Sequence, residues 1–186
     1  IKPMIRYIAE TPAVDGTGLK ITLESKVASF INANIPTYIT QHGKKALIMT
    51  GSDRWGLTRS FLEDGYACVF GDLMFSLGIP IPLRSEKQLK ILAALLMPIA
   101  TRLPFDWIYP TGGKQEERKP KQADIFHWAT VTCGDCHYIK RYMPDDMHGK
   151  VIVTNTTTPD DVALFQQSGV KYLSLIHISE PTRLRR

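Results

Sequence analysis

Apolar residues in the middle of the chain form two short runs separated by one helix-spaced stretch. The run Ala46–Met49 stops before Gly51, the stretch Leu57–Asp64 carries its apolar residues on one face, and Tyr66–Phe70 is apolar again. This order predicts a strand, a glycine turn, a helix and a second strand, with Asp72 just after that strand. A nucleotide-binding βαβ unit has this order of elements, and the rest of the chain is interpreted around it.

The same alternation of short runs and helical stretches continues on both sides of this unit. Apolar spacing predicts strands and helices, and the two close prolines of Leu73–Pro82 predict a loop. Alternating strands and helices indicate an α/β, Rossmann-like fold, with a mostly parallel sheet and helices on both faces. The remaining predicted strands are Thr11–Asp15, Ala129–Thr132, Val151–Thr154 and Val170–Leu173, and the remaining helices are Leu19–Asn32, Glu86–Ala100, Gln122–Trp128 and the stretch after Thr158.

The pattern divides the chain into three parts. Residues 1–44 are interpreted as the end of an N-terminal substrate-side region, and residues 45–173 as a Rossmann-like dinucleotide-binding domain. Residues 174–186 resemble a translated sequencing adapter, so they are set aside as an artefact, with a genuine basic tail as the alternative. Because the chain begins at Ile1 in helix-like sequence, we expect a fragment truncated at both ends.

Composition narrows the class of protein. The formal charge is +5, and without the three arginines and one glutamate of the tail it falls to +3, too small an excess to favour a nucleic-acid partner. No apolar run is long enough to span a bilayer, so no membrane partner is expected. Three cysteines do not suggest a disulfide framework, which favours a reducing, cytoplasmic setting.

The glycine turn is the predicted cofactor site. Gly51, Ser52 and Gly56 would bring backbone N–H groups and a helix N-terminus to a pyrophosphate, and Asp72 would accept hydrogen bonds from a ribose diol. No basic residue directly follows Asp72, which favours NAD, with NADP possible. The turn lacks a middle glycine and carries Asp53 near the phosphate position. The alternative is a Rossmann-like domain that binds another nucleotide-like ligand, or none.

A hydroxyl-rich turn follows the predicted strand Val151–Thr154. Asn155 and Thr156 are suited to hydrogen-bonding a ribose or a nicotinamide amide, and both are predicted to contact the cofactor. The simpler reading is that Thr158 caps the next helix, with Pro159 in its first turn.

The segment from Cys133 to His137 has the spacing C-x-x-C-H, which is found in c-type haem attachment sites and in half of a zinc site. Haem attachment requires export, and zinc requires two further ligands, so no metal is predicted. A redox C-x-x-C would open a helix at Cys136. The alternative is a strand end that faces a pocket, with Asp135 and His137 as its polar groups.

Two groups of polar residues are candidates for chemistry. His137 is suited to moving a hydroxyl proton, and Arg141 or Lys140 to holding a substrate carboxylate; a solvated helix turn is the alternative. Asp15 and Lys20 flank a glycine turn and would bind or activate a hydroxylated substrate, although a plain turn and cap gives the same pattern.

Several collinear motifs carry a resemblance to a known family. They are TPAVDGTGLK, GSDRWG, GDLMFSLGIPIPLRS, TRLPFDWIYPTGGKQ, HYIKRYMP and VIVTNTTTPDDV. Over Ile5–Leu173 the chain resembles bacterial proteins labelled as quinate 5-dehydrogenases, of the quinate/shikimate dehydrogenase type. The resemblance implies NAD(P)-linked oxidation of a ring hydroxyl on a small cyclic hydroxy acid such as quinate or shikimate. It also implies a catalytic lysine–aspartate pair, for which Lys20 and Asp15 are the candidates.

The sequence therefore predicts an oxidoreductase with a small-molecule substrate, and it leaves the oligomeric state open. The alternative is a Rossmann-like protein that binds a nucleotide or metabolite without catalysis.

Overall fold

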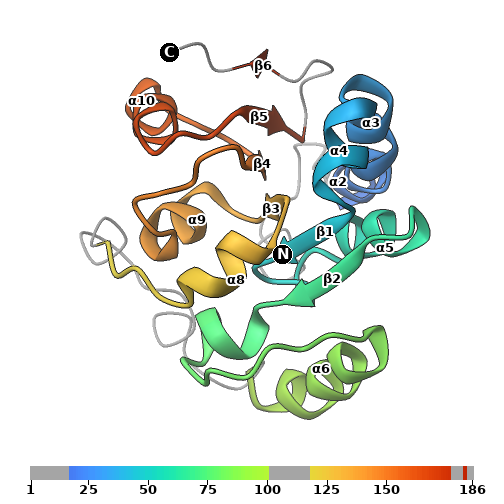
Figure 1. The fold of residues 1–186 in the computed structure, drawn as a ribbon. Helices are drawn as coiled ribbons and strands as arrows, with labels where there is room; N and C mark the ends of the chain where they lie inside the picture. The colour runs from blue at the N-terminus through green and yellow to red at the C-terminus, as the bar shows by residue number, and fades with distance from the viewer. Residues whose placement is uncertain (1–16, 101–117, 177–181, 184–186) are drawn as a thin grey trace, which may run out of the picture.

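A mostly parallel sheet forms the centre of the protein. The computed structural model describes residues 17–100, 118–176 and 182–183. Five parallel strands are ordered β2-β1-β3-β4-β5, and β6 pairs antiparallel with β5 at one edge (Figure 1). The strands are β1 (Lys45–Ile48), β2 (Ala67–Phe70), β3 (Val131–Cys133), β4 (Val151–Thr154), β5 (Tyr172–Leu175) and β6 (Thr182–Arg183).

Helices cover both faces of this sheet (Figure 1). One face carries α2 (Thr17–Glu24), α3 (Val27–Asn34), α4 (Pro36–His42) and α5 (Trp55–Glu63); the other carries α8 (Ala123–Trp128), α9 (Cys136–Tyr142) and α10 (Pro159–Gln167). The π-helical turn η1 (Asp72–Ser76) follows β2, and α6 (Glu86–Ala100) lies beyond the β2 edge.

Alternation along the strands divides the apolar core into two layers. In β1, Ala46 and Ile48 pack with α3, α4 and α5, whereas Leu47 packs with α8, α9 and α10. All three side chains are fully buried. Because successive side chains of a strand point to opposite faces, a strand that is apolar throughout needs helices on both sides. The predicted α/β, Rossmann-like fold is confirmed.

The central βαβ unit has the predicted elements, and so do several elements after it. The helix Glu86–Ala100 is confirmed, and Ser85 accepts a hydrogen bond from the backbone N–H of Gln88 (3.2 Å) at its start. Thr158 caps α10 in a full capping box with Asp161. These features were predictable because each depends on residues that are close together in the sequence.

The N-terminal helices differ from the prediction. The stretch Leu19–Asn32 is not one helix: α2 ends at Glu24 and α3 begins at Val27. Pro36 is the first residue of α4, where its missing N–H costs nothing. The predicted strand Thr11–Asp15 lies outside the described residues.

The segment between β2 and α6 begins with a helical turn that the sequence did not predict. Asp72–Ser76 forms a five-residue π-helix, and the prolines of the predicted loop follow it. At the other end of the domain, β5 continues to Leu175, two residues into the segment set aside as a tail. Ser174 is buried there, so this part of the segment belongs to the folded domain.

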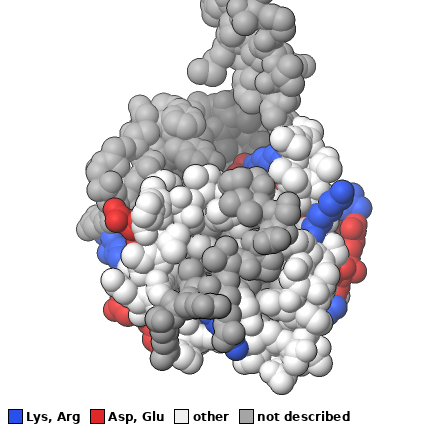
Figure 2. Space-filling model, turned by 90° about the horizontal axis from the view of Figure 1, so that it is seen from above, with Lys and Arg blue, Asp and Glu red and all other residues white. Residues whose placement is uncertain are grey.

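The surface and the helices add two observations. In the view from above, the described basic and acidic side chains lie close together at several places (Figure 2). Within the described ranges, none of the helices has the length and apolar character needed to cross a bilayer.

Candidate functional site

The carboxyl ends of β1 and β3 lie side by side at the point where the direction of the strand order reverses. From β1 the chain crosses through α5, on one face of the sheet, to β2; from β3 it crosses through α9, on the other face, to β4. The two connections therefore leave the sheet in opposite directions. In doubly wound sheets ligands bind at this divergence, outside the carboxyl ends of the strands. This place, which contains Arg54, Asp135 and Asn155, is called the crevice.

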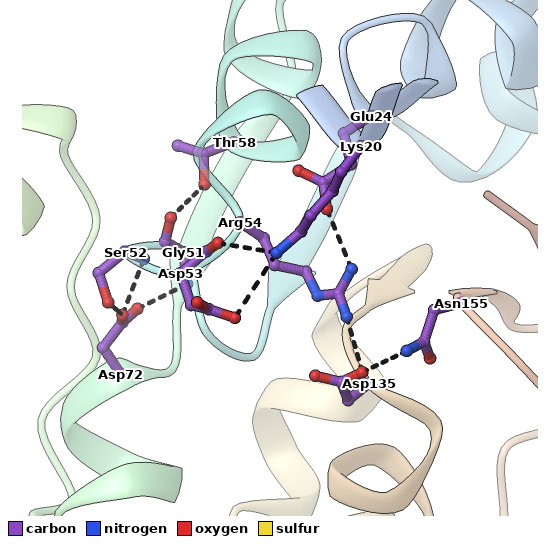
Figure 3. Close-up of polar contacts among 10 residues, drawn as sticks. All are labelled: Lys20, Glu24, Gly51, Ser52, Asp53, Arg54, Thr58, Asp72, Asp135 and Asn155. Carbon is purple, nitrogen blue, oxygen red and sulfur yellow. Dashed lines mark hydrogen bonds and ion pairs between the residues drawn. The ribbon is translucent and has the colours of Figure 1, made fainter. Parts of the chain in front are cut away.

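The turn after β1 is held by a carboxylate of the chain itself. Asp72 accepts hydrogen bonds from the backbone N–H groups of Gly51 and Ser52, both at 2.9 Å, and from the Ser52 hydroxyl at 2.5 Å (Figure 3). Its side chain is buried, and Thr58 also donates to the carbonyl oxygen of Gly51 (3.0 Å). The N–H groups expected to bind a pyrophosphate therefore already donate to Asp72, and both Asp72 oxygens are occupied.

The glycines of this turn are explained by packing. A Cβ on Gly51 would lie 2.7 Å from a ring carbon of Phe70, and a Cβ on Gly56 would lie 3.0 Å from the Cβ of Glu24. Real Cβ atoms essentially never show the first of these distances. Contacts within the protein thus favour glycine at Gly51 and leave little room for a side chain at Gly56, independently of any ligand.

A largely buried ionic network runs along the carboxyl edge of the sheet, from α2 to Asn155, the residue after β4. The guanidinium of Arg54 donates to Glu24 through Nη1 (3.0 Å) and to Asp135 through Nη2 (2.6 Å). The side-chain amide of Asn155 donates to the same Asp135 oxygen, Oδ1, at 2.6 Å (Figure 3). Arg54 and Glu24 are 6% and 1% exposed, whereas Asp135 is 33% exposed. The charged groups of the network thus extend from the buried Glu24 to the partly exposed Asp135.

Asp135 has an unusual position in this network. It is the residue before the first turn of α9, where an aspartate normally accepts hydrogen bonds from the helix N–H groups. Its side chain makes no such capping bond. Instead its Oδ1 is fixed by Arg54 and Asn155, and within the described ranges no hydrogen bond reaches Oδ2. The carboxylate is therefore oriented and partly exposed, with one oxygen available.

Glu24 and Arg54 were not among the site residues predicted from the sequence, and Asp135 was predicted only as a polar group. One signal was present: Glu24 lies directly after Leu23 within an apolar stripe, where an acid is rarely buried unless it pairs with a cation. Its partner is 30 residues away in the sequence, so spacing alone does not identify it.

The residues predicted for cofactor binding are only partly brought together. Gly51, Ser52 and Asp72 contact one another, while Asn155 lies across the crevice against Asp135 (Figure 3). Gly56 is buried in α5 against α2, and Thr156 is exposed beyond β4. Their predicted contacts with NAD remain predictions.

The residues predicted for catalysis and substrate binding are dispersed. His137 is exposed in the first turn of α9, two residues after Asp135. Lys20 lies beside the crevice, and its Nζ is 3.9 Å from a carboxylate oxygen of Asp53 at the surface (Figure 3). Asp15 lies outside the described residues.

The two basic residues predicted to hold a substrate carboxylate make contacts within the protein. Lys140 pairs with Asp161 in the cap of α10. Burial by itself raises the pKa of Asp161. Hydrogen bonds from Lys140 and Thr158 outweigh this effect and lower the pKa to about 2. The guanidinium of Arg141 lies 5.5 Å from the centre of the Tyr142 ring. Lys140 is therefore committed to a structural ion pair.

The two cysteines of the C-x-x-C-H segment lie in different layers of the core. Cys133 packs with the α3–α5 layer and Cys136 with the α8–α10 layer, although Cys136 does open a helix. Burial raises the pKa of Cys136 to about 12 and that of Cys133 well above its ordinary value. In the described part of the chain no cluster of three or more His, Cys, Asp or Glu side chains is placed to hold a metal ion.

Comparison with known proteins identifies the family. The chain belongs to the family described as Domain of unknown function (DUF8754), which it matches over residues 18–176. This match includes residues 174–176 and the whole parallel sheet from β1 to β5. No curated protein and no solved structure matches the chain.

Proposed function

We propose that this member of the family binds a small hydroxylated molecule in the crevice at the carboxyl edge of the sheet, between β1 and β3. One observation carries the proposal. Asp135, held by Arg54 and Asn155 at the reversal of the strand order, keeps one oxygen available and is 33% exposed. A fixed carboxylate of this kind is a hydrogen-bond acceptor for a ribose diol or for the ring hydroxyls of a cyclic acid.

The dinucleotide arrangement predicted from the glycine turn does not fit these contacts. The turn donates its N–H groups to Asp72, and Asp53 adds a second negative charge beside it. A pyrophosphate in that position would have to displace a charge-assisted set of hydrogen bonds and face like charge. Binding of a hydroxylated metabolite or nucleoside is therefore the first proposal, and cofactor binding at the Gly51 turn is not part of it.

A second candidate function is the NAD(P)-linked dehydrogenation of a cyclic hydroxy acid, as the resemblance implies. The observation that favours it is the position of His137, exposed and two residues from Asp135 at the same edge. In this proposal Asp135 accepts a hydrogen bond from a substrate hydroxyl, and His137 takes up a hydroxyl proton. A cytoplasmic setting belongs to the same proposal and is supported by three free, buried cysteines.

Calorimetric titration tests the first proposal. Quinate, shikimate and adenosine are titrated separately into the purified chain and into Asp135→Asn. If the carboxylate accepts a ligand hydroxyl, the variant should bind at least one of them about tenfold more weakly. Asp145→Asn is the matched control, because Asp145 is 86% exposed after the far end of α9 and should leave affinity unchanged. Absence of heat with all three ligands would contradict the proposal.

Two further measurements test the dehydrogenase candidate. NAD and NADP are titrated under the same conditions. If neither cofactor gives heat, this candidate is removed and the first proposal stays intact. If heat is seen, absorbance at the nicotinamide band with quinate and with shikimate tests for turnover. His137→Gln should then lower kcat with little change in KM, since its role is in proton transfer.

A further inference from the structure

A concavity lies at the amino edge of the sheet, on the opposite side from the carboxyl ends of the strands. It has a volume of about 960 Å³, which is within the range of small-molecule sites. Its base includes Lys45, Thr130, Lys150 and Lys171, which begin or directly precede β1, β3, β4 and β5. Thr130 donates its N–H to the Lys45 carbonyl and Lys171 donates to that of Lys150, both at 2.9 Å. These contacts place the four residues in one row across neighbouring strands.

The lining of this pocket is strongly one-sided in charge. It includes those three lysines and three of the five histidines of the chain, with no Asp or Glu among the lining residues. Neighbouring strands are about 4.8 Å apart, so the backbones of Lys45 and Lys150 are separated by roughly 10 Å. The histidines that line the pocket are His42, His127 and His148.

One of the lysines has a structural explanation. Lys150 donates from Nζ to the carbonyl oxygens of His127 (2.5 Å) and Ala129 (2.8 Å), so it caps the end of α8. Burial lowers the pKa of Lys150, and the positive charge of Lys45 lowers it further. The negative charge of Asp146 raises this pKa by a smaller amount. The amino edge is thus a place where positive charges already repel one another.

The other two lysines have no such explanation. Within the described ranges, the ammonium groups of Lys45 and Lys171 make no hydrogen bond and no ion pair. Lys171 lies over the ring of Tyr38, 4.2 Å from its centre, and 5.7 Å from that of Tyr172. Two cations therefore line one pocket whose described lining residues include no carboxylate.

We propose that this pocket at the amino edge binds a small multivalent anion of the phosphate type. The ammonium groups of Lys45 and Lys171 would act as point charges for phosphate oxygens, as lysine commonly does. Both residues line the same pocket as Lys150, whose pKa the charge of Lys45 lowers, so a bound anion would offset the repulsion between these cations. The site is separate from the crevice and from the function proposed for it.

The test is a calorimetric titration with pyrophosphate at low ionic strength. The unmodified chain should bind, Lys45→Gln and Lys171→Gln should each bind about tenfold more weakly, and added salt should weaken binding further. Lys44→Gln is the matched control. Lys44 is adjacent to Lys45 in sequence, but it donates to the carbonyl of Asp64 (2.8 Å) and does not line the pocket. The pyrophosphate affinity of Lys44→Gln should therefore differ from that of the unmodified chain by less than about twofold. Thermal melts establish that all three variants are folded.

Amide chemical shifts locate the bound anion. Pyrophosphate should shift the amide signals of Thr130, Gly149 and Gly169, which line the pocket. Shifts confined to Gly51 and Gly134, at the carboxyl edge, would overturn the proposal, as would absence of heat or an equal loss in Lys44→Gln. ADP binding as tightly as pyrophosphate means that phosphate alone is recognised, and tighter ADP binding means that the pocket takes a phosphorylated nucleoside. A DNA duplex that binds more tightly than either would overturn the small-anion assignment.

Discussion

Replacing Arg54 with methionine should destabilise the protein strongly. The guanidinium is 6% exposed and is 3.0 Å from an oxygen of Glu24, which is itself 1% exposed. Methionine fills similar space but leaves the Glu24 carboxylate buried without its cation. Removing one partner of a buried pair costs about 3–5 kcal/mol. For a domain of this size, that is a fall in melting temperature on the order of 10 °C.

Urea unfolding followed by circular dichroism measures this loss, and Arg59→Met is the matched control. Arg59 is also on α5, but it and its partner Glu63 are each 61% exposed, so the control should cost less than about 1 kcal/mol. Glu24→Gln in the Arg54→Met background removes the stranded charge and should recover about 2 kcal/mol. A loss below about 1 kcal/mol in Arg54→Met, or no recovery in the double variant, would refute the view that this ionic network is buried and coupled.

Three further predictions concern stability and reactivity. Because the pKa of Asp161 is lowered to about 2, below its ordinary 3.8, its ion pair stabilises the fold above pH 4 and this contribution disappears as the pH falls toward 2. Lys140→Met should therefore cost on the order of 1–2 kcal/mol at pH 7, and the difference in urea midpoint from the unmodified chain should close over that acid range. Gly51→Ala places a Cβ 2.7 Å from the ring of Phe70 and should lower stability by about 1–3 kcal/mol, whereas Gly18→Ala, in a helix with nothing within 4 Å, should raise it slightly in the same assay. Burial raises the pKa of all three cysteine thiols, so a thiol reagent at pH 8 should label the native protein far more slowly than the urea-unfolded protein; one rapidly labelled thiol would contradict this assignment.

The fold was predictable where the determining residues are close in sequence. The apolar run of β1, the helix after Gly51 and the cap at Thr158 each depend on a few neighbouring residues. The break between α2 and α3 was missed because it lies in a continuous helical pattern, and Glu24 at that break is fixed by a hydrogen bond from Arg54, the residue before α5. Apolar spacing indicates a helix but does not show where tertiary contacts divide it.

The site was less predictable than the fold because its contacts are distant in sequence. Asp72 is 21 residues from Gly51, and Arg54 is 81 residues from Asp135. The C-x-x-C motif pairs Cys133 with Cys136 because they are close in sequence. In the fold, Cys133 at the end of β3 packs in one layer of the core and Cys136 packs in the other. It also assigned the glycine turn to a ligand, although the same N–H groups can be satisfied by a carboxylate that the chain supplies.

The charges at the two edges of the sheet predict where different parts of a ligand would bind. At the carboxyl edge Arg54 is outnumbered by Glu24 and Asp135, and Asp72 closes the adjacent turn, so uncharged hydroxyl groups are accepted more readily there than phosphates. At the amino edge the lining residues include lysines and no acids, which favours phosphates. If NAD binds to this chain, the edge it uses is therefore decided by two variants. Lys45→Gln should weaken NAD binding if the pyrophosphate directs it to the amino edge, and Asp135→Asn should weaken it if a ribose directs it to the crevice. If both variants bind NAD as tightly as the unmodified chain, neither edge binds NAD in the way these charges predict.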